Sequence, residues 1–171
     1  YDERNRLEEA KKWYIKAGEQ GNVGAMLNLG LIYDIENNIN EKKKWYLKAA
    51  ESGNIQAQYN LGVMFMEKNQ NIEAEKYFLN ASLEGDSDAQ NNLGMLYANG
   101  KYVNKNIALS NDWLLKAAKQ GNSMAQFNIG RNYLNGDNGL PKNKAVALMW
   151  LKKAAKNGHA QAELLFDGLY P

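Results

Sequence analysis

Residues 45–65, WYLKAAESGNIQAQYNLGVMF, combine an aromatic pair with small side chains at fixed distances from it. Trp45 and Tyr46 form the pair. The small residues that follow are Ala49, Ala50, Gly53, Ala57 and Gly62. Small side chains leave room for aromatic rings on a facing helix, so the stretch predicts two helices that pack closely against each other.

The same pattern occurs five times along the chain. A first glycine slot holds Gly21, Gly53, Gly85, Gly121 and Gly158, at spacings of 32, 32, 36 and 37 residues. A second slot, nine residues later, holds Gly30, Gly62, Gly94 and Gly130. Self-similarity at this period indicates an array of helical repeats.

Each repeat is expected to contain two helices, which we term helix A and helix B. The first glycine suits the left-handed residue that ends a helix. A good N-cap residue follows this glycine in four copies, at Asn22, Asn54, Asp86 and Asn122. In the first complete copy, helix A is expected over about residues 24–33, and helix B carries Trp45 and Tyr46 on its inner face. The sequence therefore predicts an all-α protein.

The second glycine lies in the middle of helix A, where glycine costs about 1 kcal/mol relative to alanine. A close crossing of helix A and helix B would compensate for this cost. We therefore expect Gly62→Leu to destabilise the protein by at least about 1–3 kcal/mol through overpacking.

The segment W-Y-x-K-A-A-E-x-G, followed by A-Q-x-N-L-G-x-x-Y, resembles the Sel-one-like repeat (SLR), a relative of the tetratricopeptide repeat (TPR). The resemblance extends over essentially the whole chain. It implies a right-handed superhelical α/α solenoid of antiparallel helix pairs, forming one unit over residues 1–171. The expected parts are a helix B alone in 1–21, complete repeats in 22–53, 54–85, 86–121 and 122–158, and a helix A alone in 159–171.

The later copies depart from the pattern at three positions. Asp167 occupies the second glycine slot of the last copy, and His159 occupies its N-cap slot. In the fourth copy, Asn132 replaces an apolar residue of helix A. The open ends of such an array leave apolar surface uncovered, so self-association through the ends is one expectation.

Composition argues against several function classes. The 171 residues include 21 basic and 19 acidic side chains, so the net charge of +2 gives no strong attraction to nucleic acid or anionic membranes. Cysteine is absent and there is one histidine, which argues against thiolate chemistry and zinc. No apolar run approaches the roughly 18 residues of a membrane span. We expect no cofactor, no metal and no membrane span.

No catalytic arrangement stands out. Some disulfide-rich SLR relatives are described as weak β-lactamases, which calls for a serine with a lysine three residues on, and no serine here has that neighbour. Carboxylates two residues apart, such as Glu73 and Glu75, diverge on a helix. We therefore expect the chain not to be an enzyme, with a weak hydrolase as a remaining alternative.

Partner binding is expected on residues of helix A that vary between copies. In TPR-like solenoids helix A lines the concave face, and the resemblance implies the same here. The two candidate slots hold Leu27, Tyr59, Asn91 and Phe127, and then Leu31, Val63, Met95 and Arg131. This apolar stripe is a candidate groove for a peptide or a partner helix, with Tyr59, Phe127 and Arg131 as expected anchors. The alternative is that these side chains pack against the neighbouring helix A.

Two other patterns each have two interpretations. Asparagine recurs at positions 28, 60, 92 and 128, where its amide is expected either to bond within the solenoid or to clamp an extended backbone. The lysines of EKKKWYLK and WLKKAAK are expected on the convex side, as a solvated face or as a surface for an acidic partner. An RNA-binding repeat would need a basic concave face, and the candidate slots offer only Arg131.

The resemblance implies a bacterial scaffold or adaptor that binds a peptide or protein on its concave face. Bacterial SLR proteins include immunity-like and host-interaction factors, so binding to a secreted protein is the alternative. These relatives favour a periplasmic or secreted location over the cytoplasm. Residues 1–20 carry charges where a signal peptide would be apolar, so a targeting segment is expected to lie outside this sequence.

Overall fold

The structure, a computed structural model, describes residues 2–100 and 103–169. The predicted solenoid also takes in residues 1, 101–102 and 170–171, which lie outside the described residues. The described part consists of helices joined by short connections, and it contains no strand. The helices are α1 (Asp2–Glu19), α2 (Val23–Ile35), α3 (Ile39–Glu51), α4 (Ile55–Glu67), α5 (Asn71–Leu83), α6 (Ser87–Asn99), α7 (Ile107–Lys119), α8 (Ser123–Asn135), α9 (Lys144–Lys156) and α10 (Ala160–Leu169).

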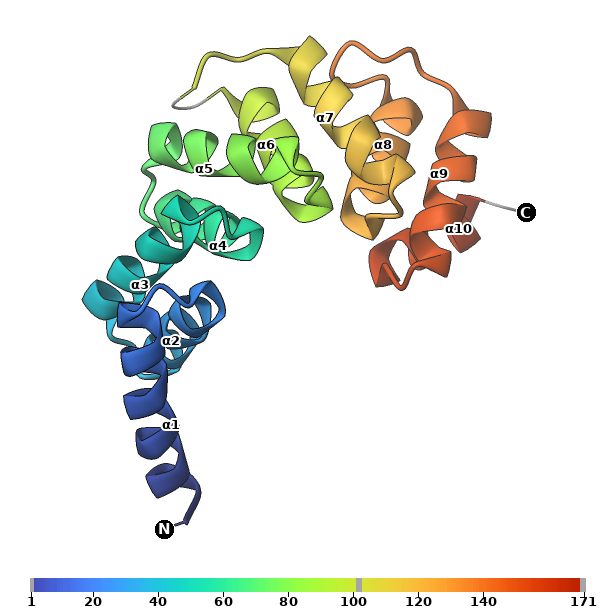
Figure 1. The fold of residues 1–171 in the computed structure, drawn as a ribbon. Helices are drawn as coiled ribbons and strands as arrows, with labels where there is room; N and C mark the ends of the chain where they lie inside the picture. The colour runs from blue at the N-terminus through green and yellow to red at the C-terminus, as the bar shows by residue number, and fades with distance from the viewer. Residues whose placement is uncertain (1, 101–102, 170–171) are drawn as a thin grey trace.

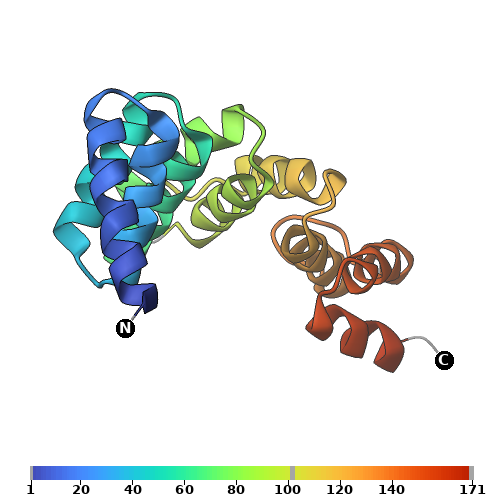
Figure 2. The same cartoon turned by 60° about the horizontal axis from the view of Figure 1, so that its bottom comes forward.

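Each helix packs against the helix before it and the helix after it in the chain. The most extensive contacts join α2 to α3, α4 to α5, α6 to α7 and α8 to α9, which are the expected pairs of helix A and helix B. Figure 1 shows these pairs following one another in an arc, with α1 projecting at one end. Figure 2 shows the two termini at opposite ends of the array. The predicted all-α solenoid of helix pairs is confirmed.

The connections between repeats have the predicted chemistry. Gly53 and Gly85 have φ angles of 82° and 95°, which a residue with a Cβ rarely adopts. Asn54 Oδ1 then accepts a hydrogen bond from the Ala57 backbone N–H at 2.8 Å and caps α4. In the last copy, His159 Nδ1 plays the same part for α10 by accepting from the Ala162 N–H at 3.2 Å. The turn from one repeat to the next is therefore set locally.

The second glycine slot is where helix B comes closest to helix A. A Cβ placed on Gly62 would lie 2.6 Å from the Phe78 ring, and one placed on Gly30 would overlap the Tyr46 ring. No side chain larger than hydrogen fits there without movement of a buried ring. This contact is the close crossing that the glycine pattern predicts.

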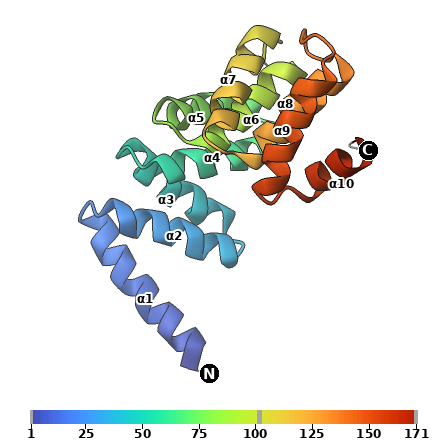
Figure 3. The same ribbon diagram turned by 90° about the vertical axis from the view of Figure 1, so that its right-hand side faces the viewer.

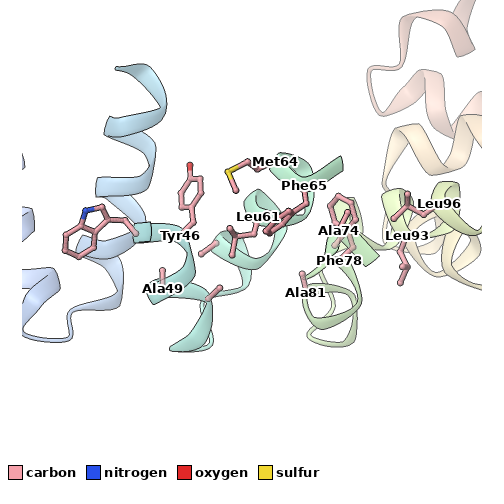
Figure 4. Close-up of a cluster of buried hydrophobic side chains, with 14 of the residues drawn as sticks. Tyr46, Ala49, Leu61, Met64, Phe65, Ala74, Phe78, Ala81, Leu93 and Leu96 are labelled. Atoms are coloured by element: carbon pink, nitrogen blue, oxygen red, sulfur yellow. The ribbon is translucent and has the colours of Figure 1, made fainter. Parts of the chain in front are cut away.

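The hydrophobic core runs along the array instead of forming one centre. Figure 4 shows buried side chains following one another from Tyr46 on α3, through Leu61 on α4 and Phe78 on α5, to Leu93 on α6. All four residues are less than 2% exposed. Each repeat therefore buries its apolar face only by contact with its neighbours.

A tryptophan on helix B covers the outer side of the core in three repeats. Trp45, Trp113 and Trp150 are buried. A lysine three residues further on lies over each ring, with Nζ to ring-centroid distances of 4.5 Å for Lys48, 4.1 Å for Lys116 and 4.6 Å for Lys153. Part of the predicted convex lysine surface is therefore engaged with aromatic rings.

The same slot on α1 holds Trp13, which is 70% exposed. Trp45 shows what covers this slot elsewhere, because its ring lies against Gly18 at the end of α1. Within the described residues no helix lies in the corresponding place over Trp13. Figure 3 shows α1 standing at the edge of the array, with α2 as its neighbour.

A buried glutamine joins the start of helix A to the end of the preceding helix B. Its Nε2 atom donates to a backbone carbonyl oxygen, with distances of 3.4 Å for Gln58 to Ala50, 3.1 Å for Gln90 to Ser82 and 3.0 Å for Gln126 to Ala118. Helix carbonyls near a C-terminus have no partner within their own helix, so this bond satisfies one of them.

The other side-chain atom of this glutamine distinguishes the repeats. Gln90 Oε1 accepts from Gln120 Nε2 at 2.8 Å, and Gln126 Oε1 accepts from Asn157 Nδ2 at 3.0 Å. The residue equivalent to Gln120 in the second complete repeat is Glu84. A carboxylate cannot donate, and Gln58 Oε1 is buried without a hydrogen-bond partner in the described structure.

Candidate partner-binding face

Helices α4, α6 and α8 line the inner side of the arc, whereas α5, α7 and α9 form its outer side (Figure 1). Side chains join neighbouring inner helices directly. Asn128 Nδ2 on α8 donates to Asn91 Oδ1 on α6 at 3.2 Å, and a side-chain hydrogen bond joins Asn92 on α6 to Tyr59 on α4. These three helices therefore form one continuous surface, which carries six of the eight predicted partner-binding residues. The other two, Leu27 and Leu31, lie on α2, and Leu31 shares a hollow with α4.

The first predicted slot lies partly inside this surface. Leu27 and Tyr59 are half-buried against the core, and the Tyr59 ring centroid lies 6.0 Å from that of Phe78. Asn91 is 7% exposed and accepts the hydrogen bond from Asn128. At this slot Asn91 bonds to the neighbouring helix A, as the alternative holds, whereas the ring of Tyr59 contacts helix B of its own repeat.

Phe127, the fourth residue of that slot, lies in an aromatic stack. Its ring is parallel to the His159 ring within 16°, with centroids 4.4 Å apart. The Arg131 guanidinium lies on the Phe127 ring, 5.9 Å from its centroid. His159 thus connects α10 to α8 by stacking while it caps α10 through Nδ1. Nothing in the repeat pattern pointed to this contact.

The second predicted slot is more open to solvent. Leu31 is 42% exposed and Met95 is 40% exposed. Arg131 is also exposed, and Val63 is half-buried. Three of the four side chains are therefore accessible to a partner.

One hollow of about 290 Å³ lies between α2 and α4. It brings together three of the predicted residues, Leu31, Tyr59 and Val63. The other lining residues were not among the predicted partner-binding residues. They are polar or charged: Asp34, Lys42, Tyr46, Asn60 and Glu67. Lys42 Nζ is 2.7 Å from Asp34 Oδ1, so these two charges are paired.

A second hollow of about 490 Å³ lies between α4 and α6 and contains Met95. It has apolar walls and a rim of amides, and no charged side chain lines it. The lining residues are Met66, Asn69, Asn71, Asn92, Met95, Leu96, Ala98 and Asn99. Methionine is flexible and polarizable, so such a hollow can adapt to apolar side chains of different shape.

The recurrent asparagines bond within the solenoid at three of their four positions. Asn60 bonds to Tyr46, Asn92 bonds to Tyr59, and Asn128 bonds to Asn91. The interpretation as a structural feature therefore accounts for these three amides. Asn60 and Asn92 also line the two hollows, one in each.

Tyr46 and Tyr59 are neutral hydrogen-bonding groups at physiological pH. Burial raises the pKa of Tyr46 to about 12, with a further contribution from the Asp34 carboxylate and an opposing one from the Asn60 hydrogen bond. Burial also raises the pKa of Tyr59, and the Asp88 carboxylate adds to this shift. Neither phenol supplies a base for chemistry near pH 7.

Metal-binding clusters and membrane-spanning helices would each point to another kind of function. Within residues 6–100 and 103–169, no group of three or more histidine, cysteine or carboxylate side chains is placed to hold a metal ion. Among the helices of the same ranges, none combines the length and apolar character needed to cross a bilayer.

The repeats identified from the sequence match a known family. The Sel1 repeat model matches residues 3–22, 23–54, 55–86, 87–122 and 123–159. The chain belongs to the Sel1 repeat family. The successive matches correspond to α1, to the pairs α2–α3, α4–α5 and α6–α7, and to the pair α8–α9. No curated protein matches the sequence.

Solved structures of bacterial Sel1 repeat proteins share the fold. A protective antigen of uropathogenic Escherichia coli, c5321, has an SLR fold, 32% identity and a TM-score of 0.88 over 94% of this chain. A Sel1 repeat protein from Oxalobacter formigenes has 32% identity and a TM-score of 0.86, also over 94%. This chain spans 36% of the first protein's length and 67% of the second's.

A likeness also extends to TPR proteins. YrrB, described as a TPR protein with an unusual peptide-binding site, has 25% identity and a TM-score of 0.62 over 98% of this chain and 86% of its own. Sel1 and TPR-like repeat proteins generally act as scaffolds for protein interactions.

Proposed function

We propose that the chain is a non-catalytic scaffold that binds a peptide or protein partner on the inner face formed by α2, α4, α6 and α8. The observation that carries the proposal is the pair of hollows on that face. Exposed Leu31 lies with half-buried Tyr59 and Val63 in one hollow, and exposed Met95 lines the other. Exposed apolar side chains grouped around a hollow are typical of peptide and protein docking sites. The peptide-binding site attributed to YrrB supports the same use of this fold.

The test is affinity capture from bacterial extract with the wild-type protein and with variants of the face. Tyr59→Ala/Phe127→Ala/Arg131→Ala removes the predicted anchors, but Tyr59 and Phe127 also pack within the structure. A second variant, Leu31→Ala/Met95→Ala/Arg131→Ala, changes only exposed side chains and should fold normally. Circular dichroism and thermal unfolding establish that each variant is folded.

A matched control changes the same kinds of side chain on other helices. Ile72 and Leu83 on α5 are each 68% exposed, and Lys119 on α7 is exposed. A protein retained by the wild type and by Ile72→Ala/Leu83→Ala/Lys119→Ala, but lost by the inner-face variant, would support the proposal. Equal retention by the inner-face variant would refute it. If the captured protein is a secreted one, the immunity-like or host-interaction alternative applies to the same face.

A further inference from the structure

The four complete inner helices carry very little charge. Each of α2, α4, α6 and α8 contains one charged residue among thirteen, and these are Asp34, Glu67, Asp88 and Arg131. Two of the four are engaged within the protein, because Asp34 pairs with Lys42 and Asp88 Oδ1 accepts from Asn122 Nδ2 at 2.7 Å. Glu67 and Arg131 are exposed and form no ion pair within the described residues.

These two unpaired charges have opposite sign and lie on either side of an uncharged region. Glu67 lines the hollow between α2 and α4, together with exposed Leu31. Arg131 is held over the Phe127 ring on α8. Between them lies the α4–α6 hollow, whose walls are formed by Met66, Met95 and amides.

The distance between the charges sets the length of a segment that could reach both. Packed helices lie about 8–10 Å apart, so the two steps from α4 to α8 amount to about 16–20 Å. An extended chain advances about 3.3 Å per residue. Five to six residues of extended chain therefore span the separation between the axes of α4 and α8, the helices that carry Glu67 and Arg131.

We propose that this face binds an extended segment of a partner protein. A basic side chain of the segment pairs with Glu67, an apolar side chain enters the α4–α6 hollow, and an acidic side chain pairs with Arg131. The basic and acidic residues of the segment are about six positions apart. This inference rests on the proposed function and specifies the chemistry of the partner. Charge complementarity fixes the register of the segment on the face, and the apolar side chain supplies buried area.

Fluorescein-labelled peptides of twelve residues provide the probe. Each contains a central leucine in a glycine and serine host, flanked by two charged positions that are three, six or nine residues apart. The charged positions hold lysine and glutamate, two lysines, or two glutamates. Binding to the whole chain is measured by fluorescence anisotropy at low and high salt.

The wild-type protein should prefer the lysine and glutamate peptide with a spacing of six. The preference over each like-charged peptide should be roughly two- to five-fold and should shrink at high salt, because exposed charge pairs are weak and screened. Glu67→Lys should shift the preference to the peptide with two glutamates. Arg131→Glu should shift it to the peptide with two lysines.

Glu51→Gln serves as the matched control, since Glu51 is an exposed carboxylate at the end of α3 and lies outside both hollows. It should leave the order of peptides unchanged. The proposal is overturned if none of the peptides binds, if spacing has no effect, or if Glu67→Lys keeps the wild-type order. Capture of a partner that the inner-face variant loses but Glu67→Lys retains would leave the proposed function standing while refuting this inference.

Discussion

Replacing Glu84 by glutamine should stabilise the protein. Gln58 Oε1 is buried without a partner, whereas the equivalent atoms of Gln90 and Gln126 accept from Gln120 and Asn157 at 2.8 and 3.0 Å. A glutamine at position 84 would bring a donor to the same place. A neutral hydrogen bond contributes about 0.5–1.5 kcal/mol to stability, and satisfying a buried acceptor places the gain toward the upper end. For a chain of this size, 1 kcal/mol corresponds to about 2–4 °C in Tm.

The assay is urea unfolding followed by circular dichroism, with two comparisons. Glu84→Ala removes the negative charge from the C-terminus of α5 without adding a hydrogen-bond donor. Its stability therefore measures how much of the gain comes from relieving the unfavourable interaction of that charge with the helix dipole. Glu84→Gln should therefore exceed Glu84→Ala by about 1 kcal/mol. In a Gln58→Met background, which copies the residue of the first repeat, Met26, this difference should disappear. A gain that persists without Gln58 would show that the hydrogen bond is not its cause.

Four further predictions concern the packing, the ionisation and the ends of the array. The Gly62→Ala variant should be less stable than the Gly168→Ala variant by about 1–3 kcal/mol in thermal unfolding. A Cβ at position 62 meets the Phe78 ring at 2.6 Å, whereas a Cβ at position 168 meets nothing within 4 Å. Equal stability of the two variants would contradict the close crossing. Burial and the hydrogen bond to Glu75 Oε1 raise the pKa of Tyr97 to about 12. The neutral Tyr97 phenol therefore contributes fully to the free energy of unfolding below pH 10, and this contribution is lost between about pH 10 and 12. Tyr97→Phe should flatten the alkaline fall in the free energy of unfolding, and an unchanged slope would argue against this ionisation. Gln90→Met should cost about 0.5–1.5 kcal/mol in urea unfolding through its lost hydrogen bonds, whereas exposed Gln56→Met should cost little. If the chain self-associates through its ends, sedimentation at increasing protein concentration should show larger species. Trp13→Asp or Leu164→Asp should remove these species, because the two side chains are 70% and 76% exposed at the ends of the array. Larger species that persist in both variants would exclude association through the ends.

The fold followed from residues whose role is fixed within one repeat. Gly53 and Asn54 form a turn and a cap using neighbours a few residues away, so their function can be read from local sequence. The second glycine slot was also predictable, because a glycine in mid-helix has a cost that only close packing offsets. In each case the residue and the neighbours that it contacts lie within about thirty residues of the sequence.

The candidate site was predicted less completely because it depends on the angle between neighbouring repeats. Asn91 and Tyr59 occupy equivalent positions, yet Asn91 is buried against Asn128, 37 residues away, while Tyr59 borders a hollow. The sequence of one repeat does not encode how far its neighbour rotates. Glu67 was missed for a related reason, since it lies one turn beyond the slots that the repeat pattern singled out.

The unpaired oxygen of Gln58 shows a second limit. Glutamine is common at this slot, and its recurrence in AQ could have marked it as a framework residue. Its bonding depends on the residue 26 to 31 positions later, which is an amide in two repeats and a carboxylate in one. The difference between the repeats lies in a pair of positions, the glutamine and the residue that precedes the next turn glycine, and neither position shows it alone.

The tryptophan slot gives the array a set of built-in fluorophores. Trp45, Trp113 and Trp150 are indoles in the same kind of environment, each beneath a lysine, but in different repeats. Variants that retain one of them and also lack Trp13 would emit from one known place along the chain. Emission spectra recorded during unfolding would then show whether the repeats lose their structure together or in sequence from one end.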